Sequence, residues 1–126
     1  MSVVDDVQGR RVLIVEDDML IAIMMEDLLQ DLGCVVVGPI NTLAGALALA
    51  AGGGPIDAAF LDIDLDGAPV FPVAEVLRAR GVPLIYATGH GGAALPAEDA
   101  GSVVLQKPFR ARALEAALRE ALRRRS

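Results

Sequence analysis

Two groups of acidic residues each follow directly on a short apolar segment of this sequence. Glu16 and Asp17 come after Arg11–Val15, and Asp62 comes after Ala58–Leu61. Runs of four or five apolar, partly β-branched residues bounded by polar ones indicate buried parallel strands. In an open α/β sheet the loops converge outside the carboxyl ends of the strands. The carboxylates are therefore predicted to share one pocket, and clustered carboxylates favour a hard cation, for which Mg2+ is the usual occupant.

Further strand-like and helix-like segments must position these residues. Strands are predicted over Arg11–Val15, Val35–Pro39, Ala58–Leu61, Pro83–Ala87 and Ser102–Gln106. Helices are predicted over Asp18–Leu32, Thr42–Ala51, Val70–Arg80 and Arg110–Arg124. A glycine follows each of the first three helical segments, as is common at helix ends. The alternation predicts an α/β fold, a doubly wound five-stranded parallel sheet with helices on both faces.

One segment departs from this alternation. Residues 88–99 contain three glycines and a proline where a fourth helix is due, and this composition disfavours a long helix. We expect a loop, or at most a short frayed turn, beside the acidic pocket.

The size and charge of the chain narrow the possible functions. A length of 126 residues is typical of one domain that buries a single core without staples. The net charge of -6 argues against direct nucleic-acid binding, which needs a basic surface.

No feature of the sequence suggests export or membrane insertion. The single Cys34 excludes an intrachain disulfide and is expected to be a small buried apolar residue. The start of the chain lacks the pattern of a signal peptide, and the apolar run Met19–Met25 is too short to span a bilayer. A cytoplasmic location is expected.

Two more polar residues complete the pattern of strand ends. Thr88 follows the fourth predicted strand and Lys107 the fifth. With these residues, the chain from 11 to 124 resembles the receiver domain of two-component response regulators. The matching motifs are Val-Glu-Asp-Asp at 15–18, Leu-Asp at 61–62, Ala-Thr-Gly at 87–89 and Lys-Pro-Phe at 107–109. Each motif is weak alone, but their joint occurrence in this order is specific. The resemblance implies the flavodoxin-like receiver fold with strand order 2-1-3-4-5.

The resemblance also implies a role for each acidic residue. Asp62 aligns with the phosphoacceptor, whose carboxylate attacks a phosphoryl group carried by a kinase histidine. Asp17 is similar to the direct Mg2+ ligand, and Glu16 to the residue that contacts the ion largely through water. Asp64 would lend its backbone carbonyl to the metal.

Further family positions match in part. Thr88 and Lys107 would each contact a phosphoryl oxygen, the Lys107–Pro108 peptide bond is cis in the family, and Phe109 would pack beneath the lysine. Val104 stands where the family often has an aromatic residue that moves with the threonine, so the usual switch is expected to be absent or altered.

The segment around the threonine resembles a particular receiver subfamily. Tyr86-Ala87-Thr88-Gly89 is similar to a Phe-Ala-Thr-Gly signature, with Tyr86 in place of the phenylalanine. Members of that group often have a short or dynamic fourth helix and pair with sensor histidine kinases of the HWE type or related classes. We therefore expect such a kinase, or a histidine phosphotransfer protein, as partner.

The implied function is that of a single receiver domain over residues 1–126 with no effector domain. It would signal by protein binding or phosphorelay, and it would promote its own phosphotransfer and dephosphorylation rather than act as a conventional enzyme. The wide apolar run of the first helix is expected to leave Leu20 or Ile23 partly exposed for a partner helix.

Two other functions compete with this interpretation. Asp64-Leu65-Asp66-Gly67 resembles the nucleophile motif of haloacid-dehalogenase phosphatases, with Asp64 as nucleophile and Asp66 as acid/base. That family needs the motif on its first strand and a different continuation after the glycine. The other alternative is a receiver-like scaffold that binds partners without being phosphorylated.

Overall fold

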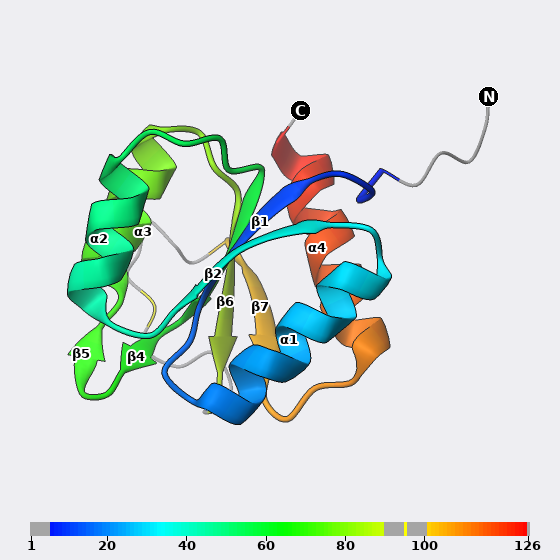
Figure 1. Ribbon diagram of the computed structural model, residues 1–126, viewed down its shortest axis with the longest axis horizontal. Helices are drawn as coiled ribbons and strands as arrows, with labels where there is room; N and C mark the ends of the chain where they lie inside the picture. Colours follow the sequence, from blue (N-terminus) through cyan, green and yellow to red (C-terminus); the bar gives the residue numbers. More distant parts are fainter. Residues whose placement is uncertain (1–5, 90–94, 96–100, 126) are drawn as a thin grey trace.

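The structure is a computed structural model that describes residues 6–89, 95 and 101–125 of the chain. Five parallel strands form one sheet with the spatial order β2-β1-β3-β6-β7 (Figure 1). They are β1 (Arg11–Val15), β2 (Val35–Ile40), β3 (Ala58–Asp62), β6 (Leu84–Thr88) and β7 (Val103–Gln106). β6 and β7 are the fourth and fifth strands of this sheet along the chain, so the predicted order 2-1-3-4-5 is confirmed.

The helices of the described part of the chain cover both faces of the sheet. They are α1 (Met19–Asp31), α2 (Leu43–Ala51), α3 (Phe71–Ala79) and α4 (Ala111–Arg125). α1 and α4 lie on one face, and α2 and α3 on the other (Figure 1). The doubly wound, flavodoxin-like architecture expected from the sequence is therefore observed.

Each strand of the sheet centre is buried on both sides. In β1, Val12 and Ile14 pack into the apolar layer beneath α1 and α4, whereas Leu13 and Val15 pack into the layer beneath α2 and α3. Side chains alternate between the two faces of a strand, so a strand covered on both faces needs apolar residues at every position. This burial explains why the sequence of β1 is a continuous apolar run.

Side-chain caps fix the starts of two helices close to the acidic strand ends. Asp18 is the N-cap of α1, and its carboxylate accepts hydrogen bonds from the backbone N–H groups of Leu20 at 3.0 Å and Ile21 at 3.3 Å. Thr42 caps α2 by accepting the Gly45 N–H at 3.1 Å. Such caps satisfy N–H groups that have no partner within the helix. The helices therefore begin one residue later than predicted.

Two features of the structure lie beyond the sequence expectations. A small antiparallel hairpin, β4 (Asp64–Leu65) and β5 (Ala68–Pro69), forms between β3 and α3. Two-residue strands carry no periodic pattern, so only the Asp-Gly pair at 66–67 could have indicated the turn. The loop or short fourth helix expected over 88–99 falls mostly on residues 90–94 and 96–100, outside the described residues. Among the described helices, none has both the length and the apolar character to cross a membrane.

β2 has an irregularity where it passes the end of β1. The register between the two strands shifts between Leu13 and Val15, and Gly38 of β2 has a φ of 94°. Beyond it, the Ile40 carbonyl accepts the Glu16 N–H at 2.9 Å. The left-handed conformation of Gly38 therefore sets the course of the chain beside the first acidic residue.

We expect Gly38→Ala to destabilise the fold more than a matched glycine substitution. A Cβ at position 38 would lie 2.9 Å from the Ile40 nitrogen and 3.0 Å from the Ile14 carbonyl oxygen, and the left-handed conformation itself costs about 1–2 kcal/mol. Gly53 has a φ of 85° with nothing within 4 Å of its Cβ position, so Gly53→Ala incurs only the conformational cost. Urea unfolding should show at least about 1 kcal/mol more destabilisation for Gly38→Ala. Equal losses of unfolding free energy in the two variants would contradict the predicted steric constraint at position 38.

Candidate functional site

Three carboxylates lie together at neighbouring strand ends. Glu16 and Asp17 follow β1, and Asp62 is the last residue of β3, the strand that pairs with β1. One carboxylate oxygen of each residue lies within 4.8 Å of the others. Glu16 and Asp62 are buried and Asp17 is half-buried. The sheet thus gathers acidic residues that are far apart in the sequence.

Lys107 brings one positive charge to this cluster. It follows β7, and its Nζ lies 2.8 Å from Glu16 Oε1 and 3.4 Å from Asp62 Oδ2. The peptide bond between Lys107 and Pro108 is cis, and Phe109 packs against the apolar layer beneath α1 and α4. A single ammonium group therefore faces two of the three carboxylates.

Thr88 stands at the same edge of the sheet. It is the last residue of β6 and is buried, and its neighbour Ala87 pairs with Asp62 of β3. Its carbonyl accepts the backbone N–H of Lys107 at 2.7 Å. A hydroxyl, an ammonium and the carboxylates thus share the carboxyl ends of β1, β3, β6 and β7, where ligands bind in open α/β sheets.

Negative charge is concentrated around Asp62. Burial, the hydrogen bond with Asp17 and the charge of Glu16 raise the pKa of Asp62 from 3.8 to about 7, although Lys107 acts in the opposite direction. Burial and the two neighbouring acids together therefore disfavour the carboxylate form of Asp62 more than Lys107 favours it.

Asp17 and Lys107, the other two groups of the cluster whose pKa is shifted, stay charged. Burial by itself would raise the pKa of Asp17, but hydrogen bonds that involve Asp62 and the backbone of Asp66 outweigh it and the pKa is lowered. Burial would likewise lower the pKa of Lys107, but the interactions with Glu16 and Asp62 outweigh it and the pKa is raised. Asp62 is therefore the residue expected to take up a proton in this cluster.

The donor set fits a hard divalent cation. Carboxylate oxygens are the side-chain ligands that Mg2+ and Ca2+ prefer, and the oxygens of Glu16, Asp17 and Asp62 lie close enough together to contact one ion. Three carboxylates against one ammonium leave an excess of negative charge, which adds to burial in raising the pKa of Asp62. A cation at this position would remove the repulsion between the acidic groups.

Asp64 and Asp66 contribute backbone groups rather than side chains. Both side chains are exposed on the hairpin, and neither belongs to the cluster of described residues that could hold a metal. The Asp64 N–H donates to Asp62 Oδ1 at 3.4 Å, and the Asp66 N–H donates to Asp17 Oδ2 at 2.6 Å. The contact of Asp66 was not expected from the sequence, because no side-chain pattern reveals a backbone donor.

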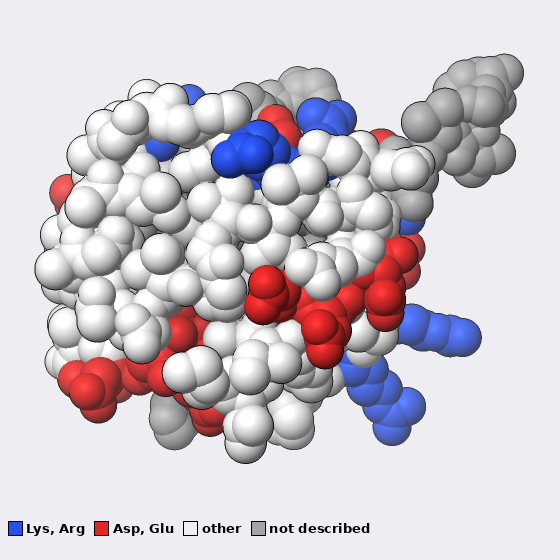
Figure 2. Space-filling view, in the orientation of Figure 1, with Lys and Arg blue, Asp and Glu red and all other residues white. Residues whose placement is uncertain are grey.

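The first helix exposes apolar side chains beside the cluster. Leu20 is 80% exposed, Met19 64% and Ile23 47%, which agrees with the exposure expected for Leu20 or Ile23. Met19 and Ile23 also line a hollow of about 220 Å³ together with Glu16 and Asp17. Figure 2 shows acidic side chains over the hairpin and over part of α1, with uncharged side chains around the start of that helix.

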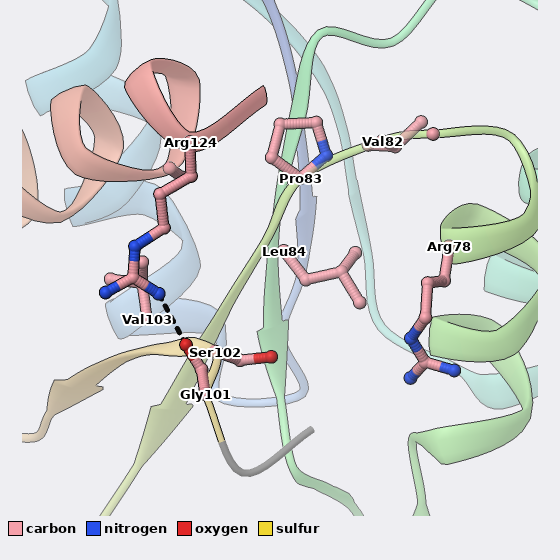
Figure 3. A pocket seen from close by; sticks show the side chains of 10 residues that line it. Arg78, Val82, Pro83, Leu84, Gly101, Ser102, Val103 and Arg124 are labelled. Carbon is pink, nitrogen blue, oxygen red and sulfur yellow. Dashed lines mark hydrogen bonds between the residues drawn. The ribbon is translucent and has the colours of Figure 1, made fainter. Parts of the chain in front are cut away.

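A second hollow, of about 360 Å³, lies at the opposite end of the sheet between α3 and α4. Arg78 and Arg124 flank it on two sides, with Pro83 and Leu84 between them (Figure 3). Arg124 donates a hydrogen bond to the Gly101 carbonyl. These residues lie near the starts of β6 and β7, so this hollow is separate from the carboxylates at the strand ends.

We expect the Asp62 carboxyl to titrate near pH 7 in the metal-free protein and at a lower pH in the presence of Mg2+. A cation favours the carboxylate form, whereas burial and the other two acids favour the protonated form. Carbon-13 NMR of the side-chain carboxyls, assigned with Asp62→Asn, measures both midpoints. A midpoint near pH 4 without metal would contradict the repulsion inferred here.

The same shift predicts how stability depends on pH. The folded-state pKa lies above the unfolded value of 3.8, so the folded protein binds more protons between the two values. The stabilising contribution of Asp62 is complete below about pH 4 and is lost as pH rises through about 7. The stability of Asp62→Asn relative to wild type should therefore increase between about pH 5 and about pH 8, as measured by urea unfolding. A constant difference would refute the assignment.

The arrangement of the site agrees with sequence and structure comparisons. The response regulator receiver domain family matches residues 12–119. No curated protein sequence matches the chain. The solution structure of SdrG from Sphingomonas melonis Fr1 is 44% identical, with a TM-score of 0.80, and the match covers 90% of this chain and 97% of SdrG.

Two further solved structures bear on the acidic cluster. The BeF3-activated conformation of SdrG from Pseudomonas melonis Fr1 is 45% identical over 89% of this chain and 95% of that one, with a TM-score of 0.75. The receiver domain of the sensor histidine kinase PA1611 from Pseudomonas aeruginosa PAO1 has a magnesium ion coordinated in its active-site cleft. That domain is 26% identical to this chain, with a TM-score of 0.77, and the match covers 90% of this chain and 98% of that one. The family match spans most of the sequence, and the chain belongs to the response regulator receiver domain family.

Proposed function

We propose that this protein accepts a phosphoryl group on Asp62 from a phosphohistidine of a sensor kinase or phosphotransfer protein, in a reaction that depends on Mg2+. The observation that carries the proposal is the position of Asp62 at the end of β3. Lys107 Nζ lies 3.4 Å from it, and oxygens of Glu16 and Asp17 lie within 4.8 Å. Receiver domains are signalling domains, so the phosphorylated state would be a signal rather than a step in the turnover of a metabolite.

Asp62 would act as the nucleophile. One of its oxygens attacks phosphorus, the new P–O bond forms as the P–N bond to the histidine breaks, and the electron pair of that bond leaves with the imidazole. The carboxyl must be ionised to attack, and a pKa of about 7 leaves it partly protonated in the metal-free protein at neutral pH. Mg2+, when bound, would supply positive charge that favours the carboxylate and offsets the charge of the transferring oxygens.

The other residues of the cluster would bind and orient. Glu16 and Asp17 would hold the metal together with Asp62, and the backbone carbonyl of Asp64 would be a further ligand. The ammonium of Lys107 would contact one phosphoryl oxygen, and the hydroxyl of Thr88 would donate to another. Positioning and charge compensation of this kind are the main contributions of proteins to phosphoryl transfer.

The start of α1 is the proposed docking surface for the partner. Met19, Leu20 and Ile23 are exposed and follow closely on Asp17, so a partner helix packed on them would bring its histidine near Asp62. Burying a large apolar side chain contributes about 1.5–3 kcal/mol, enough for two or three of them to dominate a transient complex. A kinase of the HWE type is the partner suggested by the subfamily resemblance. Because histidine kinases draw on ATP, the proposed location is the cytoplasm.

The phosphatase alternative has less support from the structure. It would require Asp64 as nucleophile and Asp66 as acid/base, but both side chains are exposed on a hairpin that follows the third strand of the sheet. The acidic groups that can share a cation are those of Glu16, Asp17 and Asp62.

Substitution of the two aspartates separates these functions. With acetyl phosphate and Mg2+, Asp62→Asn should abolish phosphorylation because the attacking oxygen is replaced, whereas Asp64→Asn should retain it. Mobility-shift gels and intact-protein mass spectrometry measure the product. Loss of phosphorylation only in Asp64→Asn would favour the phosphatase, and a wild type that neither binds Mg2+ nor is phosphorylated would be a scaffold.

The docking surface is tested by comparing two phosphodonors. Leu20→Ser should slow phosphotransfer from a cognate phosphorylated kinase roughly tenfold, equivalent to about 1.4 kcal/mol, and leave phosphorylation by acetyl phosphate unchanged. Val35→Ser is the matched control, because Val35 is also an exposed apolar residue but lies at the start of β2, away from the carboxylates. Equal slowing by both variants, or slowing with both donors, would place the docking surface elsewhere.

A further inference from the structure

The hairpin between β3 and α3 ends in a turn that depends on two left-handed residues. Asp64 pairs with Pro69 and Leu65 with Ala68, so residues 66–67 form a two-residue turn. Asp66 has a φ of 52° and Gly67 a φ of 91°. Positive φ at both central positions is the signature of a type I′ turn, the turn that suits a tight hairpin. Among the described residues other than glycine, Asp66 is the one with a positive φ.

The base of the hairpin is attached to the core. Leu65 is buried in the apolar layer beneath α2 and α3, together with Val15 and Leu61 at the ends of β1 and β3. The Val70 N–H donates to the Ile63 carbonyl at 2.8 Å and closes the segment behind the hairpin. The turn is therefore held at a fixed distance from the strand ends rather than projecting freely into solvent.

The backbone N–H groups of Asp64 and Asp66 donate hydrogen bonds to two different carboxylates of the acidic cluster. The Asp64 N–H donates to Asp62 Oδ1 at 3.4 Å, and the Asp66 N–H donates to Asp17 Oδ2 at 2.6 Å. Asp64 lies in β4, and Asp66 is the first residue of the turn that follows it. The strand and its turn therefore each donate one N–H to the acidic cluster, and the contact to Asp17 is the shorter of the two.

We propose that Asp66 is a positioning residue for the metal site: its backbone N–H, held in place by the type I′ turn, keeps the carboxylate of Asp17 ready to bind Mg2+. This inference rests on the proposed Mg2+ site. The Asp66 N–H satisfies one oxygen of Asp17, while the carboxylate stays within reach of Glu16 and Asp62. A ligand whose orientation is fixed in advance loses less freedom when the ion binds, and loss of such outer contacts typically weakens metal binding about 10–100-fold.

The proposal assigns the effect to the backbone of Asp66 and not to its carboxylate. The side chain of Asp66 is exposed, and the hydrogen bond uses the main-chain nitrogen. Glycine at this position keeps both the N–H and the left-handed conformation, whereas a β-branched valine keeps the N–H but disfavours positive φ. Asp66→Gly and Asp66→Val remove the same negative charge. A difference between their Mg2+ affinities therefore measures the effect of the turn conformation.

The deciding measurement is the Mg2+ dissociation constant of wild type, Asp66→Gly and Asp66→Val, obtained from amide shifts in nitrogen-15 NMR titrations. We expect Asp66→Gly to bind within about twofold of wild type and Asp66→Val to bind roughly tenfold more weakly. Equal affinity of the two variants would overturn the inference while leaving the proposed function intact. Absence of Mg2+ binding in wild type would instead overturn the proposed function.

A second measurement tests the same contact without any substitution in the hairpin, so it remains valid if the valine variant misfolds. In the metal-free protein, the Asp66 amide proton should move upfield and exchange faster with solvent in Asp17→Ala, because its acceptor is gone. Asp18→Ala is the matched control, since the Asp18 carboxylate accepts from the first turn of α1 instead. An Asp66 amide that responds equally to both substitutions, or to neither, would show that it does not hold Asp17.

Discussion

Three carboxylates and one ammonium group share the end of the sheet, and the repulsion among the carboxylates is the constraint around which the site is organised. Like charges at this separation do not stay together unless the scaffold holds them, and here β1 and β3 are adjacent parallel strands with both faces buried. Lys107 balances part of the charge, and a proton on Asp62 can balance more. The scaffold thus maintains a local excess of negative charge that a divalent cation can relieve, which connects the packing of the core to the chemistry of the site.

The parts of the fold that could be predicted are those whose burial shows in the order of apolar and polar residues along the sequence. Continuous apolar runs located the central strands because a strand buried on both faces has no polar positions, and the parallel order then placed Glu16, Asp17 and Asp62 at one edge. The hairpin escaped prediction because two-residue strands have no period. The pairing of Lys107 with Glu16 as well as Asp62 depends on side-chain geometry that spacing does not encode.

The acidic cluster and the exposed apolar residues of α1 lie at the same end of the molecule. The exposed apolar residues at the start of α1 adjoin Asp17, and the polar hairpin adjoins it from the side of β3. A partner that covers the helix would also exclude water from the approach to Asp62, which strengthens electrostatic interactions there. The hollow between Arg78 and Arg124 lies at the other end of the sheet and takes no part in this arrangement.

The hydrogen bond from the Lys107 N–H to the Thr88 carbonyl has a mechanical consequence. It ties the end of β6 to the loop that follows β7, so a displacement of either residue pulls on the other. β7 is the outermost strand on its side of the sheet, and its Val104 is partly exposed to solvent. A shift of Thr88 would therefore reach the outermost strand directly through this backbone pairing, without any change in β1 or β3.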